Sequence, residues 1–331
     1  MAFGSQIKDT FPKKTYPPMP SEKPRLSASR IKGLQSCSWE FYCSACLKLP
    51  ERVWSKTFVG SLCHIVLECL AKDNLRRKEY VETIIRTGTH KSVPSIARLV
   101  ENFKRDNPLM EDKHSADLDD LLMVALGYDF YFTGATKVLP PEWRFELLIG
   151  KAKIKGFVDR LAFYDGYAII RDYKTQKNKF TEDELENNIQ AAIYQLAVKE
   201  VFGVPAKVEF ILLRHAANKK DPKKFLQVVE PYTDSQLKGL VSYVENLHGE
   251  FETFTVEKAK LNLRAIEDKG FCFNVCGYRA PFTYFAALQN GKITRTSKTP
   301  IQPVGGEIIT EHFYSGCPYF YSPDGKLRNY S

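Results

Sequence analysis

The sequence has no apolar run long enough to span a membrane, and no apolar stretch of the secretory type near its N-terminus. It also has no internal repeat and no GxxxxGK[ST] phosphate-binding loop, which excludes a nucleotide-driven motor of that class. We therefore expect an intracellular protein without membrane contact. Disulfides are rare in a reducing compartment, so its eight cysteines are expected to be buried thiols or metal ligands.

The composition is that of an ordinary globular protein with a basic surplus. Hydrophobic residues make up 44% of the 331 residues, which is enough to bury a sizeable core. Lys and Arg number 48 against 39 Asp and Glu, a net charge of +9. This surplus favours a polyanionic partner such as nucleic acid, although many basic proteins bind none.

The chain predicts one α/β domain after a short lead-in. Residues 1–24 contain five prolines and little apolar periodicity, and we expect a flexible segment there. The domain itself is expected to span residues 25–331, with a helical subdomain over 66–138 and a sheet core over 140–215. Residues 255–331 form an irregular, cysteine-bearing C-terminal region.

Hydrophobic patterning predicts the order of the elements. We expect helices over 27–42 and 59–78, strands over 143–149, 153–164 and 167–174, a helix over 181–201 and a strand over 207–213. A further helix is expected over 234–252. A strand, a helix and another strand in succession imply a parallel pair, so the predicted fold is a mixed β-sheet flanked by helices.

The turn at Asp165-Gly166 fixes a local geometry. If it is a two-residue hairpin loop, Tyr164 faces Tyr167 and Asp159 stands opposite Asp172, with Cβ atoms about 4.5–5.5 Å apart. Lys174 lies two residues beyond Asp172 and therefore on the same face. A β-bulge would instead move Asp159 to the other face.

Two carboxylates and an ammonium on one patch can serve phosphodiester hydrolysis. Carboxylate oxygens suit Mg²⁺ or Mn²⁺, which can polarise a phosphate and generate hydroxide, while the lysine activates water. The alternative is a solvated surface cluster without function. His64, followed by Glu68 on one helix face, and the pair Gln190 and Tyr194 are further candidates, although core packing would also account for them.

Together these residues resemble the RecB-type branch of the PD-(D/E)xK nucleases. The resemblance rests on Gly60 to His64 with Glu68, Gly156 to Asp159, Asp172-Tyr-Lys174-Thr175 and Gln190 to Tyr194, in that order and spacing. It implies a restriction-endonuclease-like sheet with a helical insertion. It also implies that His64, Asp159 and Asp172 bind the metal with the Tyr173 carbonyl, and that Lys174 is catalytic. Gln190 and Tyr194 would support the lysine or contact DNA, and Glu146 would be a supporting acid.

Several nucleases of this branch are similar in carrying an iron–sulfur cluster between the two ends of the chain. The resemblance assigns Cys37, Cys272, Cys276 and Cys317 to a [4Fe-4S] cluster. About forty residues separate the last two, which departs from the family's spacing. Cys43 with Cys46 is a rival pair, and zinc a rival metal.

The resemblance implies a Mg²⁺- or Mn²⁺-dependent DNA exonuclease in replication, recombination or repair, plausibly of phage type. It would act on single- or double-stranded DNA with an end, alongside recombination or replication proteins, and the sequence leaves its oligomeric state open. One alternative is a catalytically silent, DNA-end-binding or regulatory subunit. A structure-specific endonuclease or an RNA nuclease would use the same chemistry.

Overall fold

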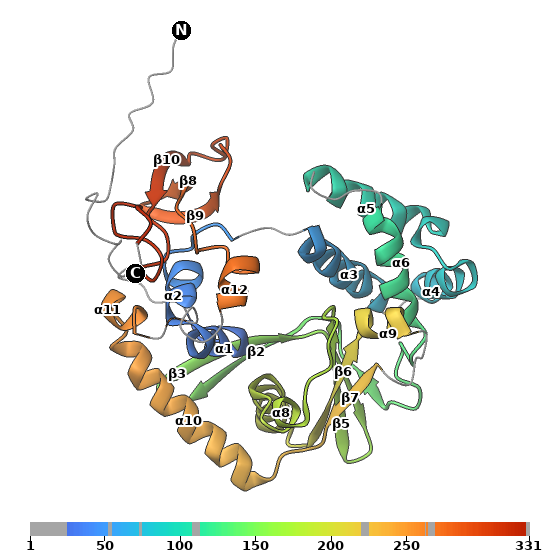
Figure 1. The fold of residues 1–331 in the computed structure, drawn as a ribbon. Coiled ribbons are helices and arrows are strands. Elements are labelled where there is room, and N and C mark those ends of the chain that lie inside the picture. The colour runs from blue at the N-terminus through green and yellow to red at the C-terminus, as the bar shows by residue number, and fades with distance from the viewer. Residues whose placement is uncertain are drawn as a thin grey trace. The chain divides into compact units, whose positions relative to one another are not determined.

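The computed structural model describes residues 25–51, 55–72, 75–107, 113–219, 225–261, 263 and 269–328 (Figure 1). The lead-in expected over 1–24 lies outside the described residues. The chain divides into two compact units: the first joins residues 1–52 to 246–331, and the second spans 53–245. Among the described residues, no helix is both long and apolar enough to cross a membrane.

The second unit is built on a five-stranded mixed sheet, in the order β1-β4-β5-β6-β7. Its strands are β1 (Lys137–Val138), β4 (Arg160–Tyr164), β5 (Tyr167–Lys174), β6 (Ala206–Leu212) and β7 (Leu226–Val229). β5 and β6 run parallel and all other neighbours antiparallel. The mixed sheet expected from the strand–helix–strand pattern is confirmed.

Helices cover both faces of this sheet (Figure 1). On one face lie α3 (Ser55–Ala71), α4 (Leu75–Thr87), the 3₁₀ turn η2 (His90–Ser92), α5 (Pro94–Asp106), α6 (Lys113–Leu126) and α9 (Leu213–Lys219); on the other lie α7 (Glu182–Glu186) and α8 (Ile189–Phe202). Side chains alternate along β5, so Tyr173 joins the apolar core of the α3–α6 layer whereas its neighbours Asp172 and Lys174 bond to Gln190 of α8.

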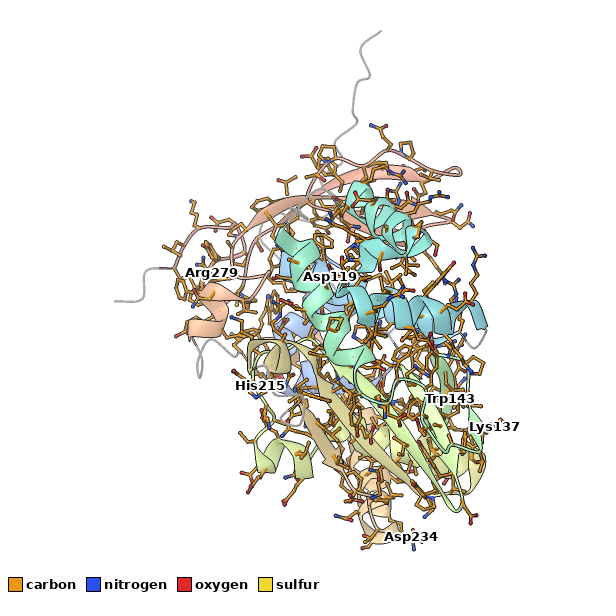
Figure 2. All side chains as sticks on the ribbon, turned by 90° about the vertical axis from the view of Figure 1, so that its right-hand side faces the viewer. Asp119, Lys137, Trp143, His215, Asp234 and Arg279 are labelled. Carbon is orange, nitrogen blue, oxygen red and sulfur yellow. The ribbon has the colours of Figure 1, made fainter. Side chains whose placement is uncertain are left out.

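Four expected elements are each divided. The helix expected over 27–42 becomes α1 (Ala28–Ser36), α2 (Ser38–Phe41) and the start of η1 (Tyr42–Cys46), and the helix expected over 59–78 becomes α3 and the start of α4. The strand expected over 153–164 breaks at Asp159 into β3 (Ala152–Val158), which pairs with β2 (Trp143–Ile149) in a separate two-stranded sheet, and β4. Lys137 of β1 and Trp143 of β2 can be located in Figure 2. The helix expected over 181–201 begins with a capping box formed by Thr181 and Glu184 but ends early, at Glu186, and Asn188 caps a new helix, α8.

The first unit combines the two ends of the described chain. It contains α1 (Ala28–Ser36), α2 (Ser38–Phe41), the π-helical turn η1 (Tyr42–Cys46), α11 (Val256–Ala259), α12 (Lys269–Asn274) and a sheet of order β10-β8-β9, with β8 (Phe282–Gln289), β9 (Lys292–Ser297) and β10 (Ile308–Tyr314). The helix α10 (Asp234–Glu252) begins in the second unit and ends in the first. The sequence did not indicate the three-stranded sheet.

Buried hydrogen bonds join the two chain ends within this unit. The Tyr314 hydroxyl accepts from Trp39 Nε1 at 2.8 Å and from the Cys43 thiol at 3.5 Å, and it donates to the Tyr278 carbonyl. The Tyr278 hydroxyl in turn donates to the Leu49 carbonyl at 3.2 Å. Segments more than 200 residues apart in sequence therefore share one polar core.

A buried ion pair ties β5 to β6 on the face that the α3–α6 layer covers. Arg171 Nε and Nη2 lie 2.9 and 2.8 Å from Glu209 Oε2, and Nη1 donates to the Asp129 carbonyl. The arginine side chain is only 2% exposed and packs over Phe132 at 4.2 Å. At this depth an unpaired charge would be costly, so each partner depends on the other.

We expect Arg171→Leu to lower the free energy of unfolding by about 3–5 kcal/mol, because it leaves the Glu209 carboxylate buried without its cation. The double variant Arg171→Leu/Glu209→Leu should lose less than the single one, since no charge is stranded. Urea-induced unfolding measures both. The control is Lys207→Leu on β6, which breaks an exposed ion pair with Glu230. It should lower the free energy of unfolding by at most about 1 kcal/mol. A double variant less stable than Arg171→Leu would contradict this account.

Candidate active site

Asp159 lies where two hairpins meet. The β4–β5 register runs from Tyr164↔Tyr167 to Arg160↔Arg171, as the two-residue turn predicts, so Asp172 is one step beyond its last pair. The β2–β3 register ends at Trp143↔Val158, so Glu142 is one step beyond that one. Two bonds fix the junction: Glu142 N donates to the Asp159 carbonyl at 3.1 Å, and Tyr173 N donates to Asp159 Oδ2 at 2.8 Å.

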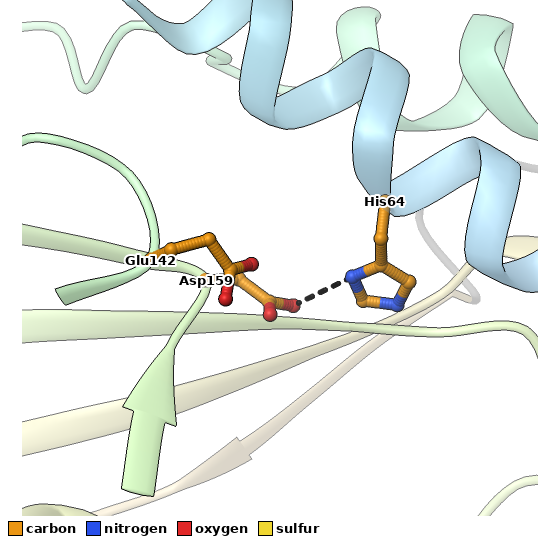
Figure 3. Close-up of side chains that lie close together, drawn as sticks. All are labelled: His64, Glu142 and Asp159. Atoms are coloured by element: carbon orange, nitrogen blue, oxygen red, sulfur yellow. Dashed lines mark ion pairs between the residues drawn. The ribbon is translucent and has the colours of Figure 1, made fainter. Parts of the chain in front are cut away.

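His64, Glu142 and Asp159 form a group that could hold a metal ion (Figure 3). One ligand atom from each lies within 4.8 Å of the others, and His64 Nδ1 is 3.5 Å from Asp159 Oδ2. His64 projects from α3 towards the two acids, which come from the strand junction (Figure 3). One imidazole and two carboxylates are a ligand set that accepts a divalent cation.

An open pocket of about 810 Å³ lies over this group. Its lining comes from α3, from the strand junction and from the segment after β5: Gly60, Ser61, His64, Ile65, Glu68, Glu142, Asp159, Thr175 and Gln176. The candidate ligands therefore face a space large enough for water and a phosphate group.

Asp172 and Lys174 form a second, denser group beside the first. Lys174 Nζ lies 2.7 Å from Asp172 Oδ2 and donates to Gln190 Oε1 at 2.7 Å. Gln190 Nε2 donates to Asp172 Oδ1 at 2.9 Å and to the Tyr194 hydroxyl at 2.8 Å. The glutamine thus holds the acid and the lysine at once, and Tyr194 holds the glutamine.

Burial and neighbouring negative charge raise the pKa values of Asp172 and Glu142. Burial raises the pKa of Asp172; Lys174 opposes this, and the charge of Asp159 adds to it. Burial and then Asp159 raise the pKa of Glu142. Burial alone would lower the pKa of His64, but its interaction with Asp159 and the charges of Asp172 and Glu142 raise it above the usual value. A divalent cation would relieve this crowding of negative charge.

Two glycines allow close packing around the site. A Cβ atom on Gly60 of α3 would lie 2.8 Å from Thr175 Oγ1, so glycine lets the helix approach the residue after Lys174. A Cβ atom on Gly156 would lie 2.3 Å from the Phe145 ring, which covers this position and meets Tyr194 edge-on at 5.8 Å. The Gly156-to-Asp159 motif therefore also supports the Tyr194–Gln190 bond.

The two remaining acids of the sequence prediction lie elsewhere. Glu68 lines the pocket and pairs with Lys72 at 3.8 Å. Glu146 lies on the exposed face of β2 beside Arg144 and does not line the pocket. The sequence prediction missed Glu142, an acid that lines the pocket and also belongs to the candidate metal group. A two-residue loop at Gly150-Lys151 would have placed it opposite Asp159 by the pairing rule that was applied to the other hairpin.

All eight cysteines are free thiols. Cys37, Cys272, Cys276 and Cys317 belong to the first unit, and burial followed by the charges of the other three raises the pKa of Cys317 to about 12. Burial, Glu40, Cys37 and Cys272 raise the pKa of Cys276 to about 12 as well. The four thiols suggested by the sequence therefore lie close enough to interact.

The sequence-family model of the PD-(D/E)XK nuclease superfamily matches residues 25–280 of the chain. The chain belongs to this superfamily. Its members hydrolyse phosphodiester bonds and generally use divalent metals, which agrees with the acidic group found here. The resemblance noted in the sequence is thereby confirmed at the level of the superfamily.

The chain was also compared with curated proteins and with solved structures. No curated protein matches the chain. A solved structure described as "Putative exonuclease" from Eubacterium rectale is similar at 14% identity, with a TM-score of 0.41, over 69% of this chain and 79% of that one. A likeness of this degree carries no conclusion about activity.

We expect Mn²⁺ affinity to rise with pH through a range above that of an ordinary histidine. A protonated imidazole cannot bind metal, and the raised pKa of His64 extends the protonated form beyond pH ~6.5. Calorimetric titration between pH ~5 and ~8 measures this. His64→Gln should weaken binding and flatten its pH dependence, whereas His248→Gln on α10 should change neither. Equal pH dependence in His64→Gln and the unaltered protein would contradict it.

Proposed function

We propose that the protein is a Mg²⁺- or Mn²⁺-dependent deoxyribonuclease that degrades DNA from an end. One observation carries the proposal: the group His64, Glu142 and Asp159 opens into a pocket directly beside the Asp172–Lys174 pair. A metal-binding group and a positioned ammonium are the two components that phosphodiester hydrolysis requires. The net charge of +9 supports a polyanionic substrate.

His64, Asp159 and Glu142 would hold the cation, with Asp172 and the Tyr173 carbonyl as further ligands. Carboxylate oxygens favour Mg²⁺ or Mn²⁺. When bound, such an ion polarises the phosphate and lowers the pKa of a coordinated water. Glu142 supports the proposal in a second way: its φ of 57° is unusual for a residue other than glycine, and such conformations cluster at functional sites.

Lys174 would orient the attacking water and stabilise the charge that develops on the phosphate. Among the described residues, two of its three N–H groups are engaged by Asp172 and Gln190, which leaves one for water or a phosphate oxygen. The side chain is 23% exposed, so solvent can reach it. Gln190 and Tyr194 would act as positioning residues, since Gln190 bonds to both Asp172 and Lys174 and Tyr194 accepts a hydrogen bond from Gln190.

The setting we propose follows from the same features. The protein would work inside the cell, on single- or double-stranded DNA, in replication, recombination or repair, and would be of phage type. Both units would serve one nuclease activity, with recombination or replication proteins as partners.

We expect Lys174→Met and Asp159→Asn each to lower the cleavage rate by at least about 100-fold, with DNA binding largely retained, because both act on the reacting phosphate. Labelled linear, circular and single-stranded DNA, and RNA, are incubated with Mg²⁺, with Mn²⁺ or with chelator. Loss of cleavage in chelator and faster loss of linear than circular DNA are expected.

The matched control is Lys238→Met, a lysine of α10 outside the pocket, which should cleave at the normal rate. Full activity in Lys174→Met would reject the assigned site. DNA binding without any cleavage would favour a silent end-binding subunit. Equal cleavage of circles would favour an endonuclease, and preference for RNA an RNA nuclease.

We further propose that Cys37, Cys272, Cys276 and Cys317 hold a [4Fe-4S] cluster. Burial and the charges of neighbouring thiols raise the pKa values of Cys276 and Cys317, so a compensating positive charge is needed before all four cysteines can be thiolates, and a metal centre would supply it. A single tetrahedral zinc would bring its sulfur ligands within about 3.8 Å of one another. No three cysteine sulfurs among the described residues all lie within 4.8 Å of one another, so they do not form the compact set that a single zinc ion needs.

Protein purified without oxygen should show a broad visible absorption band and about four iron atoms per chain. Cys37→Ala and Cys317→Ala should lose both and melt at a lower temperature, because metal binding stabilises the fold. Cys69→Ala, on α3 of the second unit, should keep both. Colourless, iron-free protein, with or without zinc, would rule out the cluster.

A further inference from the structure

The two-stranded sheet of β2 and β3, which we call the ribbon, starts at the candidate metal group. Glu142 immediately precedes β2, and Asp159 immediately follows β3. The strands pair in register from Trp143↔Val158 to Ile149↔Ala152, and the turn at Gly150-Lys151 closes the far end. Each residue along a strand of the ribbon towards this turn therefore lies about 3.3 Å further from the candidate metal group.

The ribbon has one packed face and one open face. Trp143 packs on Phe202 of α8, and Phe145 on Tyr194 of the same helix. Because side chains alternate along a strand, the residues between them point the other way. This open face consists of Arg144, Glu146, Leu148, Lys153, Lys155 and Phe157.

The open face is strongly basic. Arg144, Lys153 and Lys155, with Lys151 at the turn, oppose one carboxylate, Glu146, which pairs with Arg144. Arg144, Lys153 and Lys155 against Glu146 give the face a net charge of +2, and the side chain of Glu245 on α10 lies against Gly150 beside Lys151 at the turn. Within the described part of the chain, no ion pair involves the three lysines, so their charges are available to a ligand.

The same face exposes two large apolar side chains. Phe157 is 48% exposed and Leu148 is 69% exposed. Phe157 stands directly across from Arg144 and two residues before Asp159, about 7 Å along the strand from that ligand. Aromatic rings between cations are the surface that single-stranded nucleic acids bind, since bases stack on the rings and phosphates meet the cations.

We propose that the open face of the ribbon binds the single-stranded segment of the DNA strand that is being cut, which rests on the proposed function. Phe157 stacks on a base next to the scissile phosphate. Lys155 and Lys153, about 13 and 20 Å from Asp159, follow the phosphates further along. The ring requires an unpaired base, because bases inside a duplex are already stacked on one another.

The open face would therefore determine which DNA ends the protein prefers. It would favour DNA with a frayed or single-stranded end over a blunt duplex, because only the former offers Phe157 a free base. It would also set the direction in which the strand leaves the metal group, since the ribbon projects from that group on one side only.

The test measures binding of full-length protein in chelator, where no cleavage occurs. The probes are a fluorescein-labelled oligothymidylate of about 20 nucleotides and a blunt duplex of the same length, followed by anisotropy at about 50–200 mM salt. Lys153→Ala/Lys155→Ala should lower the slope of log affinity against log salt by about 1.4, for two lost phosphate contacts. Lys238→Ala on α10 is the control and should leave the slope unchanged.

Phe157→Ala should weaken oligothymidylate binding by about tenfold without changing the salt slope. Phe157→Trp should restore binding, whereas Phe157→Leu, which keeps the apolar surface but not the aromatic ring, should not. The duplex should bind equally to all three. Thermal melting at the unaltered temperature shows that the exposed substitutions leave the fold intact.

Two failures can be told apart. If the unaltered protein binds and cleaves DNA but the ribbon variants keep its affinity and salt slope, the ribbon is not the binding face and the proposed function stands. If the unaltered protein neither binds nor cleaves DNA, both proposals fall. Equal losses on the duplex and on the oligothymidylate in Phe157→Ala would also overturn the stacking role.

Discussion

The repulsion between neighbouring carboxylates is the constraint on which the site depends. Two hairpin registers bring Glu142 and Asp172 to either side of Asp159, and burial together with the charge of Asp159 raises the pKa values of the outer two. Such a cluster is destabilising unless cations balance it. The fold supplies one permanent cation, Lys174 of β5 against Asp172, while His64 of α3 lies against Asp159 and is a cation only in its protonated, metal-free form. A divalent ion would complete the balance.

This distribution of charge divides the site into two parts. Asp172 and Lys174 are held by Gln190 in a closed network with little freedom, as a group that must orient water requires. His64, Glu142 and Asp159 are more open and line the pocket, as ligands that must admit an ion and a phosphate would be. Asp159 belongs to both parts, since Tyr173 N fixes its carboxylate and His64 approaches the same oxygen. A change in the geometry of one part of the site would therefore displace Asp159 and so alter the other part.

Much of this arrangement could be predicted from the sequence because two-residue turns fix register. Asp165-Gly166 determines the pairing up to Arg160↔Arg171, and with it the positions of Asp159 and Asp172. The break at Asp159 could not be predicted, because β3 and β4 read as one strand and only tertiary pairing separates them. Glu142 was missed because the pairing rule was not applied to Gly150-Lys151, whose two-residue loop places Glu142 opposite Asp159. The C-terminal sheet was missed because its edge strands β9 and β10 are mostly not buried and lack the alternation of a buried face, although the central strand β8 buries Tyr284, Ala286 and Ala287.

The first unit raises a different question of stability, since its parts come from opposite ends of the chain. Bringing Cys37 near Cys317 closes a loop of nearly the whole protein, and the entropic cost of closure grows with loop length. Hydrogen bonds such as Trp39 to Tyr314 offset part of this cost, but each contributes only about 1 kcal/mol. A metal centre shared by both ends would contribute far more, because its binding free energy becomes folding free energy. Such a centre would keep the chain ends together rather than cut DNA. Its loss should therefore lower the stability of the first unit first.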